Sequence, residues 1–557
     1  MRKVIKKVSS LILATTLVVS AFTGCGESGN EVETTTPVDP SSMTPEEFYG
    51  VDSWESEEYE VASDDHYRNY YEVFVYSYAD SNGDGIGDIQ GLISKLDYIE
   101  ETGFNGIWLM PIMPSTTYHK YDVIDYYDID PQYGTMDDFK ELIEECHARN
   151  INVIIDLVFN HTSSQHEWFK TATNYIKTLE AGQEPDYTVC PYANYYNFAK
   201  TEDVRNTTGY CAIPGTEYSY EGMFWSEMPD LNLDNESVRR EIEDIASYWL
   251  NLGVDGFRLD ASKEYWSGSV DRNIEVLSWF SDYVQSVRED AYIVSEIWEG
   301  YSSIKNYYTS GVESIFDYAA GNNSGTVIKA INLKNGNTFA NQLVNMENGF
   351  RESNADYVNA PFLSNHDTGR ISGFATYTEE KMKFAGAINQ IMAGCTFVYY
   401  GEEVGMTGSG AAQDEDKRAP MPWTAFSGGE TTQGPPNMGT VTHKFDDVAD
   451  QMKDVNSIYW YYRKMLHIRS TYEEIPKGIS EAIDVGENAI CCLKKTYDGS
   501  SMYVLANFSN EEKTITFASG DYGYTEMVDF LVTDASMNVK IEGDSITIPA
   551  YGIAFMK

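Results

Sequence analysis

The sequence predicts a protein of the α/β class: a (β/α)8 TIM barrel with a lobe inserted after its third strand, and a C-terminal antiparallel β-sandwich domain. Two observations predict the barrel. From residue 73 onward, short β-branched or aromatic runs alternate with helical patterns, and eight such runs precede residue 475. Strands that alternate with helices form parallel sheets, and eight of them can close into a barrel. A third observation predicts the last domain: after about residue 475, short strands follow one another without helices between them.

Each barrel strand is expected on one of the apolar runs. These runs are Val73–Ala79, Gly106–Pro111, Asn152–Val158, Gly256–Leu259, Tyr292–Ser295, Ser314–Asp317, Tyr357–Leu363 and Thr396–Tyr400. Between the first two strands, apolar residues recur at helical spacing and predict one amphipathic helix. Its buried face would carry Ile89, Leu92, Ile93, Leu96 and Ile99.

The alternation is interrupted at two places. About 70 residues between the third strand and Met228 are rich in Tyr, Asn, Thr and Gly with little periodicity, which predicts an inserted lobe near the mouth of the barrel. The C-terminal strands are expected at Ala489–Lys494, Ser501–Asn507, Lys513–Phe517, Ser545–Pro549 and Gly552–Met556. The chain then divides into a signal peptide (1–24), a disordered acidic tether (25–66), the first part of the barrel (67–160), the inserted lobe (161–230), the second part of the barrel (231–474) and the C-terminal β domain (475–557).

The N-terminus has the pattern of a targeting segment. Basic residues precede a short apolar run, Leu11–Phe22, which is too brief for a transmembrane helix. The run ends in Phe-Thr-Gly-Cys25, which resembles a bacterial lipoprotein signal, where cleavage before the cysteine is coupled to lipid attachment on its sulfur. The alternative is an ordinary secretory signal with an incidental cysteine. We expect an extracytoplasmic protein, anchored to the membrane through Cys25 and held off it by a tether rich in Thr, Ser, Pro, Glu and Asp.

The bulk composition excludes one class of partner. A formal net charge of −48 over 557 residues would repel phosphates, so no nucleic acid partner is expected. The acidic excess is typical of the solvated surface of a secreted protein, with a salty habitat as the alternative. The cysteines other than Cys25 match no zinc motif. Cys190 and Cys211 bracket a loop-like stretch, where a disulfide and two free thiols are both open.

Three carboxylates stand at the ends of short apolar runs: Asp260, Glu296 and Asp367. An ionised carboxylate loses hydration near a core, so such positions are locally unfavourable and are expected where a site needs them. In parallel barrels the chemistry lies at the carboxyl ends of strands, where all three fall. With Arg258 and two histidines on similar runs, they indicate glycosidic bond chemistry.

Together these segments resemble the α-amylase family of glycoside hydrolases (family 13) over roughly residues 67 to 557. The motifs that carry the resemblance stand in family order: Gly106–Pro111, Asp156–His161, Met228–Asn232, the three carboxylate segments, and Gly401–Met406. The resemblance implies that Asp260 is the nucleophile, Glu296 the general acid/base and Asp367 the stabiliser of the transition state.

Physical considerations agree with these implied roles. A retaining enzyme needs two carboxyl groups about 5–5.5 Å apart, one ionised and one protonated. Arg258 lies two residues before Asp260, so on a strand both side chains face the same side, and its cation should keep Asp260 ionised. Glu296 precedes Ile297 and Trp298, and apolar neighbours would raise its pKa toward that of an acid.

The resemblance also implies the contacts with the sugar. Tyr121 would be the aromatic platform, His161 and His366 would bind hydroxyl groups, and Lys263 would contact sugars on the leaving-group side. The full implied set of substrate-binding residues is Tyr121, Asp122, His161, Arg258, Lys263, His366 and Arg370. This chain departs from the family at Lys120, where Gly is usual, and at Glu264, where many amylases have His.

A second site is readable from Asp80-Ser-Asn-Gly-Asp-Gly-Ile-Gly-Asp88. Oxygen ligands at alternate positions with glycines for a tight loop suit the hard Ca²⁺ ion. A strand precedes the loop and its twelfth position is Gly91 instead of Glu, so it is not an EF-hand. By resemblance to the family's calcium site, the ligands would be Asp80, Asn82, Asp84, Asp88 and the Ile86 carbonyl, with a structural role; a solvated acidic turn is the alternative.

The sequence therefore predicts a monomeric, lipid-anchored α-amylase that cuts internal α-1,4 bonds of starch-like glucans with retention. Met228-Pro-Asp-Leu-Asn232 resembles a group intermediate between oligo-1,6-glucosidases and neopullulanases. The alternatives are an exo-acting α-glucosidase or oligo-1,6-glucosidase, a 4-α-glucanotransferase, and a non-catalytic surface glycan-binding protein. The last of these would be expected to have lost one or more of the carboxylates.

Overall fold

The computed structural model describes residues 43–56, 61–62, 65–322, 324–373, 377–408, 413–424 and 430–557. The predicted signal peptide and Cys25 lie outside these residues, so both stay predictions. Among the helices of the described ranges, none has the length and apolar character that crossing a membrane requires.

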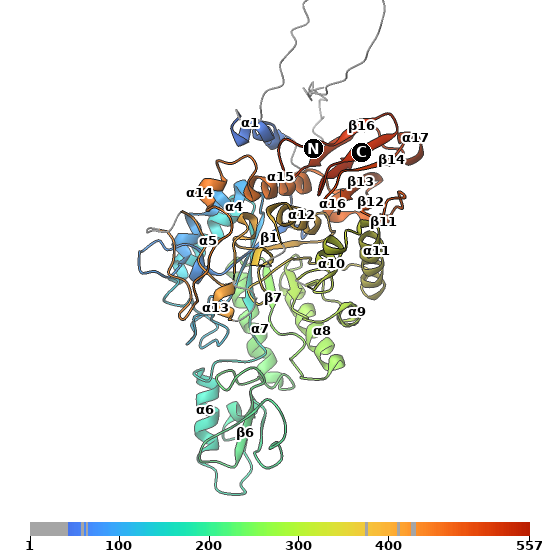
Figure 1. The fold of residues 1–557 in the computed structure, drawn as a ribbon. Coiled ribbons are helices and arrows are strands. Elements are labelled where there is room, and N and C mark those ends of the chain that lie inside the picture. The colour runs from blue at the N-terminus through green and yellow to red at the C-terminus, as the bar shows by residue number, and fades with distance from the viewer. Residues whose placement is uncertain are drawn as a thin grey trace, which may run out of the picture. The chain divides into compact units, whose positions relative to one another are not determined.

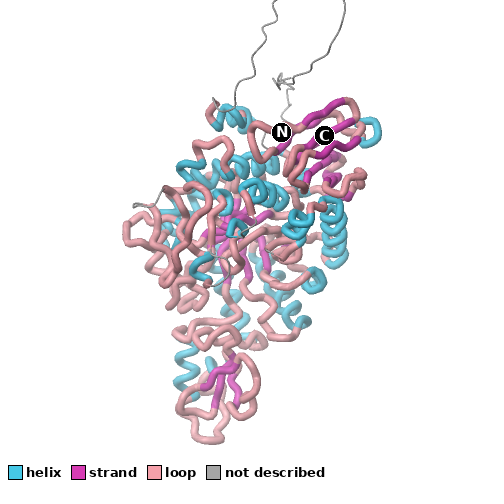
Figure 2. Tube along the Cα trace, viewed as in Figure 1, coloured by secondary structure: helices cyan, strands magenta, loops and turns pink. Residues whose placement is uncertain are grey.

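The central sheet is parallel, and Figure 1 shows its strands β1 and β7 among the surrounding helices. Its order is β10-β1-β2-β3-β7-β8-β9, and the gap between β9 and β10 is filled by residues 360–362 through the bridges Phe316–Ala360 and Phe362–Phe397. Figure 2 shows these strands at the centre with helices around them, which confirms the predicted (β/α)8 barrel. The strands are β1 (Asn69–Val73), β2 (Gly106–Leu109), β3 (Asn152–Leu157), β7 (Gly256–Leu259), β8 (Tyr292–Ser295), β9 (Ser314–Ile315) and β10 (Thr396–Tyr399).

The longer helices follow the strands around the barrel. They are α5 (Met136–Ala148), α7 (Glu236–Asn251), α8 (Val270–Val287), α9 (Tyr301–Tyr307), α10 (Thr326–Leu333), α11 (Gly336–Ser353), α12 (Glu379–Gln390) and α15 (Ile458–Thr471). Local sequence explains where they begin. In α5, Thr135 and Asp138 form a reciprocal capping box, and Asn235 caps α7 by accepting from the Ser237 amide.

The first strand and the helix after it differ from the prediction. The expected strand Val73–Ala79 is wrong: β1 ends at Val73, and Val75–Tyr78 form the short helix α2. The ladder to β2 stops at the pair Val73–Leu109. The residues after it stay buried, and burial alone does not separate strand from helix. The single predicted helix over residues 89–99 is two helices, α3 (Ile89–Ile93) and α4 (Leu96–Thr102), because Lys95 between them is not helical.

Residues between β3 and α7 form a small substructure of their own. It contains α6 (Glu167–Ile176) and a three-stranded sheet of order β4-β6-β5, made of Phe198–Lys200, Tyr218–Glu221 and Tyr210–Ala212. Cys190 and Cys211 are both free thiols in this segment. The segment also contains the 3-10 helix η3 (Pro191–Asn194) and the isolated antiparallel bridge Tyr196–Leu231.

Antiparallel sheets at the C-terminus enclose a second hydrophobic cluster. One sheet has the order β11-β12-β13-β18-β15, from Ile479–Ala482, Ile490–Tyr497, Ser500–Asn507, Ile553–Met556 and Met527–Leu531. The other has the order β14-β17-β16, from Lys513–Thr516, Ser545–Ile548 and Lys540–Glu542. These sheets confirm the predicted C-terminal antiparallel β domain. The strands β11, β15 and β16 are additional to those expected from the sequence.

The predicted tether is shorter at its C-terminal end than 25–66. Residues 43–56 form α1 (Pro45–Tyr49) and the 3-10 helix η2 (Val51–Ser56). Tyr49 stacks on Trp460 of α15 with ring centroids 5.5 Å apart, and Trp54 stacks on His467 at 4.3 Å. Disorder was predicted for residues 43–56 from their polar composition. The stacking of Tyr49 and Trp54 on rings of α15 instead holds these residues in place.

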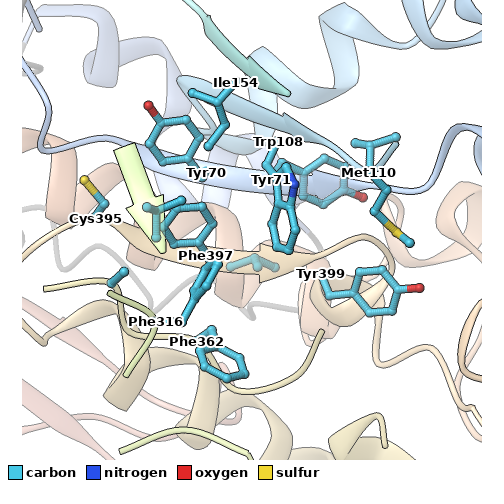
Figure 3. Close-up of a cluster of buried hydrophobic side chains, with 14 of the residues drawn as sticks. Tyr70, Tyr71, Trp108, Met110, Ile154, Phe316, Phe362, Cys395, Phe397 and Tyr399 are labelled. Carbon is cyan, nitrogen blue, oxygen red and sulfur yellow. The ribbon is translucent and has the colours of Figure 1, made fainter. Parts of the chain in front are cut away.

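Aromatic residues fill the interior of the barrel (Figure 3). The Tyr70 ring on β1 stacks on Phe397 of β10 with centroids 4.9 Å apart. The ring centroid of Trp108 on β2 lies 5.3 Å from that of Phe316 and 5.6 Å from that of His366, and the second pair is T-shaped. The packed core therefore reaches up to the site residues and forms a rigid floor beneath them.

Candidate active site

Strand register brings the candidate residues together at the carboxyl end of the barrel. Alternation on β1, β3 and β7 turns Glu72, Asp156 and Arg258 inward, and Asp156 is the direct pairing partner of Arg258. Gly256, two residues before Arg258, permits this register because a Cβ there would stand 1.9 Å from the Tyr292 carbonyl oxygen. Asp260, Glu296 and Asp367 follow β7, β8 and the 360–362 segment.

Arg258 is the centre of the charged cluster. Its Nη1 lies 2.7 Å from Asp260 Oδ1 and 2.9 Å from Asp156 Oδ1, and its Nη2 lies 2.9 Å from Glu296 Oε2. The guanidinium also lies 5.2 Å from the centroid of Trp108. One buried cation thus faces three carboxyl groups, so they cannot all be ionised without an uncompensated buried charge.

The pKa directions follow from this shared cation. Burial raises the pKa of Asp260, and Arg258 opposes that effect without cancelling it. Burial likewise raises the pKa of Glu296, against the same cation. Burial raises the pKa of Asp156 to about 7. The Arg258 cation favours the ionised form of Asp260, as expected from the sequence. It also contacts Asp156 and Glu296, so Asp260 is not its only carboxyl partner.

Glu296 is held by two hydrogen bonds. Its Oε2 accepts from the Ala261 amide at 2.9 Å, and its Oε1 accepts from the Tyr318 hydroxyl at 3.2 Å. Ala261 has φ +49°, a left-handed conformation that is unfavourable for a residue with a Cβ. Such strain tends to persist where the surrounding structure enforces it, often at functional sites. Here the strained backbone aims an N–H group at the carboxyl.

Asp367 lies in a strongly cationic environment. Its Oδ2 is 3.1 Å from His366 Nε2 and its Oδ1 is 2.9 Å from Arg418 Nη2. Burial alone would raise the pKa of Asp367, but these two partners outweigh it and hold the pKa well below its usual range. Asp367 is therefore the carboxylate of the three that stays ionised at all ordinary pH values.

The two histidines have opposite charge preferences. His366 Nδ1 lies 2.6 Å from Glu72 Oε1, and its Nε2 lies 2.7 Å from the Tyr121 hydroxyl. Although burial lowers the pKa of His366, Asp367 and Glu72 raise it overall to about 9. His161, whose Nε2 contacts the Tyr121 carbonyl at 3.2 Å, has its pKa lowered by burial to about 4. His366 is thus charged at neutral pH and His161 is neutral.

A pocket of about 360 Å³ opens above these groups. Asp260, Glu296 and Asp367 line it together, and so do Tyr121, His161 and Lys263. At its rim, Phe224 is 51% exposed and Trp298 is 44% exposed. The volume falls within the range of small-ligand sites, and the mixture of aromatic faces with converging polar groups suits a sugar. The other lining residues are His119, Met228, Ala261, Glu264, Asp414 and Arg418.

Four of the predicted sugar-binding residues do not line the pocket: Asp122, Arg258, His366 and Arg370. His366 is fully buried and contacts two lining residues, Tyr121 and Asp367. Arg258 lies beneath the pocket as the ion-pair centre. Asp122 is fully buried and accepts hydrogen bonds from the hydroxyls of Ser115, Thr116, Thr117 and Ser163, so it organises its own loop. Arg370 packs 4.0 Å from the centroid of Tyr399 and donates to the carbonyls of Lys417 and Tyr400. The Asp122 carboxylate and the Arg370 guanidinium are therefore occupied by contacts outside the pocket and do not face a sugar bound there.

Sequence reasoning missed several residues of the site. Glu72 could have been found, because it alternates with Tyr70 on the first strand, but the strand was placed too late in the chain. Asp156 begins a quoted motif but was given no role. Arg418 and Tyr318 stand in loops without periodicity, and no signal in the sequence connects them to Asp367 or Glu296.

Lys120 stands where the family usually has Gly, and the structure shows how it is accommodated. Its φ is +67°, a conformation that Gly adopts most easily, and its Nζ pairs with Asp130 at 2.9 Å.

The predicted calcium loop is held by hydrogen bonds within the loop. Asp80 accepts from the amides of Gly83 and Gly85, both at 2.7 Å, while Asp88 Oδ1 accepts from Gly91 at 2.6 Å. Among the residues that the structure describes, no three His, Cys, Asp or Glu side chains converge as a metal site would require. The oxygen donors are of the type that Ca²⁺ prefers. Asp80 Oδ1 accepts from the amides of Asn82 and Gly83, and Asp88 Oδ2 accepts from the amide and the hydroxyl of Ser81.

Residues 72–478 match the alpha-amylase catalytic domain family. The chain belongs to the α-amylase family of glycoside hydrolases. It is 39% identical over 458 residues to Alpha-amylase 3 of Dictyoglomus thermophilum, covering 81% of this chain and 87% of that protein. It is 28% identical over 546 residues to an oligo-1,6-glucosidase of Parageobacillus thermoglucosidasius, covering 83% and 93%. The solved structure of Eubacterium rectale Amy13B superposes with a TM-score of 0.86 at 43% identity, covering 91% of this chain and 98% of that one.

Because His366 is charged at neutral pH, we expect the stability and the kcat/KM of this α-amylase family enzyme to change at alkaline pH. A group with a raised folded-state pKa contributes stability fully below its ordinary value near 6.5, and that stability is lost as pH rises through about 9. Glu72→Gln removes one of the two carboxylates that raise it. We expect the alkaline limb of kcat/KM to move to lower pH by about one unit.

The pH profile of kcat/KM for the variant and the parent measures this shift. Glu313→Gln is the matched control, because Glu313 pairs with His66 at the same 2.6 Å but outside the pocket. An unchanged alkaline limb in Glu72→Gln would show that the His366 charge does not govern activity.

Proposed function

We propose that this enzyme is a retaining α-amylase that hydrolyses internal α-1,4 bonds of starch, glycogen and maltooligosaccharides. The observation that carries the proposal is the arrangement of Asp260, Glu296 and Asp367 around one pocket, with Arg258 in contact with both of the first two. Two carboxyl groups held on one guanidinium are close neighbours, as a retaining mechanism needs.

In this mechanism Glu296, whose pKa is raised by burial, gives its proton to the glycosidic oxygen. The Asp260 carboxylate attacks the anomeric carbon, and the leaving chain departs with its new hydroxyl. Water then attacks the glycosyl–Asp260 ester, giving a proton back to Glu296 and restoring both groups. Asp367, ionised throughout, accepts hydrogen bonds from ring hydroxyls and favours the positively charged transition state.

The products distinguish this function from its alternatives. We expect amylose to give a rapid fall in chain length with mixed maltooligosaccharides of α-anomeric configuration, and maltose to be cleaved slowly. Rapid cleavage of maltose with little action on amylose would instead indicate an exo-acting α-glucosidase, and cleavage of isomaltose an oligo-1,6-glucosidase. Products longer than the starting oligosaccharide would indicate a 4-α-glucanotransferase. Binding without any cleavage would indicate a glycan-binding protein.

We further propose that the loop Asp80–Asp88 binds a structural Ca²⁺ ion through Asp80, Asn82, Asp84, Asp88 and the Ile86 carbonyl. The support is the donor chemistry of the loop. Chelation with EDTA is expected to lower Tm, and excess Ca²⁺ to restore it; a ligand at about 100 times its Kd adds about 2.7 kcal/mol. Identical melting curves in EDTA and in Ca²⁺ would contradict the site. The variant Asp84→Ala should lose the response to Ca²⁺, whereas Asp97→Ala, an exposed acid on α4, should keep it.

The N-terminal sequence supports a proposal about location. We propose that the enzyme is extracytoplasmic and anchored through lipid on Cys25. In a bacterial host, labelled palmitate should enter the full chain and should not enter Cys25→Ser. A lack of label in both would indicate ordinary secretion, and equal labelling of the two would contradict attachment at Cys25.

A further inference from the structure

A buried lysine stands next to Tyr121 in the loop of residues 115–123, which borders the catalytic pocket. We call this segment the pocket loop. Lys120 is 1% exposed and does not line the pocket, whereas Tyr121 does. The Lys120 φ of +67° is unfavourable for a residue with a Cβ. Strain of this kind persists where the surrounding structure enforces it, and it clusters at active sites and ligand clamps. The contacts of the Lys120 side chain therefore indicate what enforces the strained backbone.

The Lys120 side chain joins the pocket loop to residues 130–133. Its Nζ lies 2.9 Å from Asp130 Oδ2 and donates to Gln132 Oε1 at 2.5 Å. The same Nζ lies 5.3 Å from the centroid of the Tyr133 ring. Asp130 is 4% exposed, so both charges of the pair are buried. Removing one partner of a buried ion pair is strongly destabilising, so this pair can hold a strained backbone in place.

Residues 130–133 are themselves fixed to the barrel. The Asp130 amide donates to the Ile112 carbonyl at 2.8 Å, in the segment just after β2. The Tyr133 carbonyl accepts from the Ile89 amide at 2.9 Å, at the start of α3. The buried ion pair therefore ties the pocket loop to a support that other elements hold in place.

Tyr121 is the residue of the pocket loop that meets the catalytic groups. Its hydroxyl lies 2.7 Å from His366 Nε2 and donates to Asp156 at 3.1 Å. Its ring stacks on the His366 ring with centroids 5.5 Å apart. On the other side of Tyr121, Asp122 is buried and accepts from hydroxyls of the same loop. Lys120 and Asp122 thus fix the main chain on both sides of Tyr121, and Lys120 does so through an ion pair with a residue outside the loop.

We propose that Lys120 is a positioning residue for glycosidic bond cleavage, which holds Tyr121 against the catalytic groups through the buried pair with Asp130. Because Lys120 is buried, it touches no sugar itself and acts only through Tyr121. This inference rests on the proposed function, since it assumes that a sugar is cleaved beside Tyr121. It deepens that function by assigning a kinetic role to a residue at which this chain departs from its family.

A double-mutant cycle between Lys120→Gly and Tyr121→Ala tests this role, with kcat/KM on maltoheptaose as the measurement. Glycine adopts a φ of +67° readily, so Lys120→Gly removes the side-chain contacts without opposing the backbone. In the parent background we expect kcat/KM to fall about tenfold or more, because a small misplacement of a group at the site is costly. In the Tyr121→Ala background the same substitution should change kcat/KM by less than about twofold, because residues that act through one another are not additive.

Loss of the buried pair also lowers stability, and a second variant separates the two effects. Lys120→Gly/Asp130→Asn leaves no buried charge behind, so its Tm should return toward that of the parent. Its kcat/KM should stay as low as that of Lys120→Gly. A kcat/KM that recovers together with Tm would overturn the proposal, since Lys120 would then serve stability alone. If Lys120→Gly does not fold, this variant takes its place in the cycle.

Lys334→Gly is the matched control. Lys334 is an exposed lysine at the end of α10 with φ +53°, and its Nζ contacts the Asn510 side chain outside the pocket. This variant should keep the parent kcat/KM in both backgrounds. An equal fall for Lys120→Gly in both backgrounds, or no fall in the parent background, would overturn the proposal. A parent enzyme that cleaves neither maltoheptaose nor starch would contradict the proposed function itself, and this inference with it.

Discussion

Asp260→Asn is expected to abolish turnover of starch, with a loss of kcat of about 10⁴-fold or more, because no other carboxylate can form the glycosyl ester. Glu296→Gln is expected to lose roughly 10²–10⁴-fold, the usual contribution of general acid–base catalysis. Both substitutions keep the shape of the side chain. In Glu296→Gln the new side-chain amide oxygen can still accept from the Ala261 N–H group, so the fold should be retained.

An aryl α-glucoside as substrate and azide as added nucleophile separate the roles of these residues. An aryl α-glucoside with a good leaving group does not need protonation, so Glu296→Gln should form the glycosyl ester rapidly and release a burst of phenol. Azide, which needs no base, should then speed its turnover. Asp260→Asn should show neither burst nor rescue. A burst from Asp260→Asn, or full activity of Glu296→Gln on starch, would show that the roles are assigned wrongly.

The second large effect is expected at Arg258. Replacing it by Met leaves Asp156, Asp260 and Glu296 without their shared cation in a buried site. Removing one partner of a buried ion pair costs about 3–5 kcal/mol of stability. Since the cation opposes the effect of burial, its loss raises the pKa of Asp260 further, and the acid limb of kcat/KM should move to higher pH. Activity at neutral pH should fall by roughly 10²-fold or more.

Arg258→Lys is the informative companion variant. It keeps the charge but cannot reach two carboxyl groups with a planar fork, so we expect partial recovery of stability and little recovery of rate. Arg272→Met serves as the control, because Arg272 pairs with Asp234 on the surface and such pairs contribute about 0–1 kcal/mol. Melting curves and pH profiles measure both effects. An Arg258→Met variant as stable and active as the control would contradict the central place of this cation.

Much of the fold follows from local pattern. β7 and β8 have the predicted bounds, because each is a short apolar run between turn residues. β1 was misplaced since the residues that follow it are as buried as the strand itself, and only the pairing of Val73 with Leu109 fixes its end. The ordered residues 43–56 were missed for a related reason: Tyr49 and Trp54 acquire their partners from α15, some 400 residues later in the chain.

The sequence alone determined the barrel, the family resemblance and the three carboxylates, because these depend on periodicity and on short motifs at the ends of strands. The tertiary structure decided how the charges are shared. Arg258 forms ion pairs with Asp156, Asp260 and Glu296. Arg418 pairs with Asp367, and the Tyr318 hydroxyl donates a hydrogen bond to Glu296. The tertiary structure also removed Asp122 and Arg370 from the lining of the pocket. The physical reason is that pKa values and access to substrate depend on distances between residues far apart in the chain, and local sequence does not encode those distances.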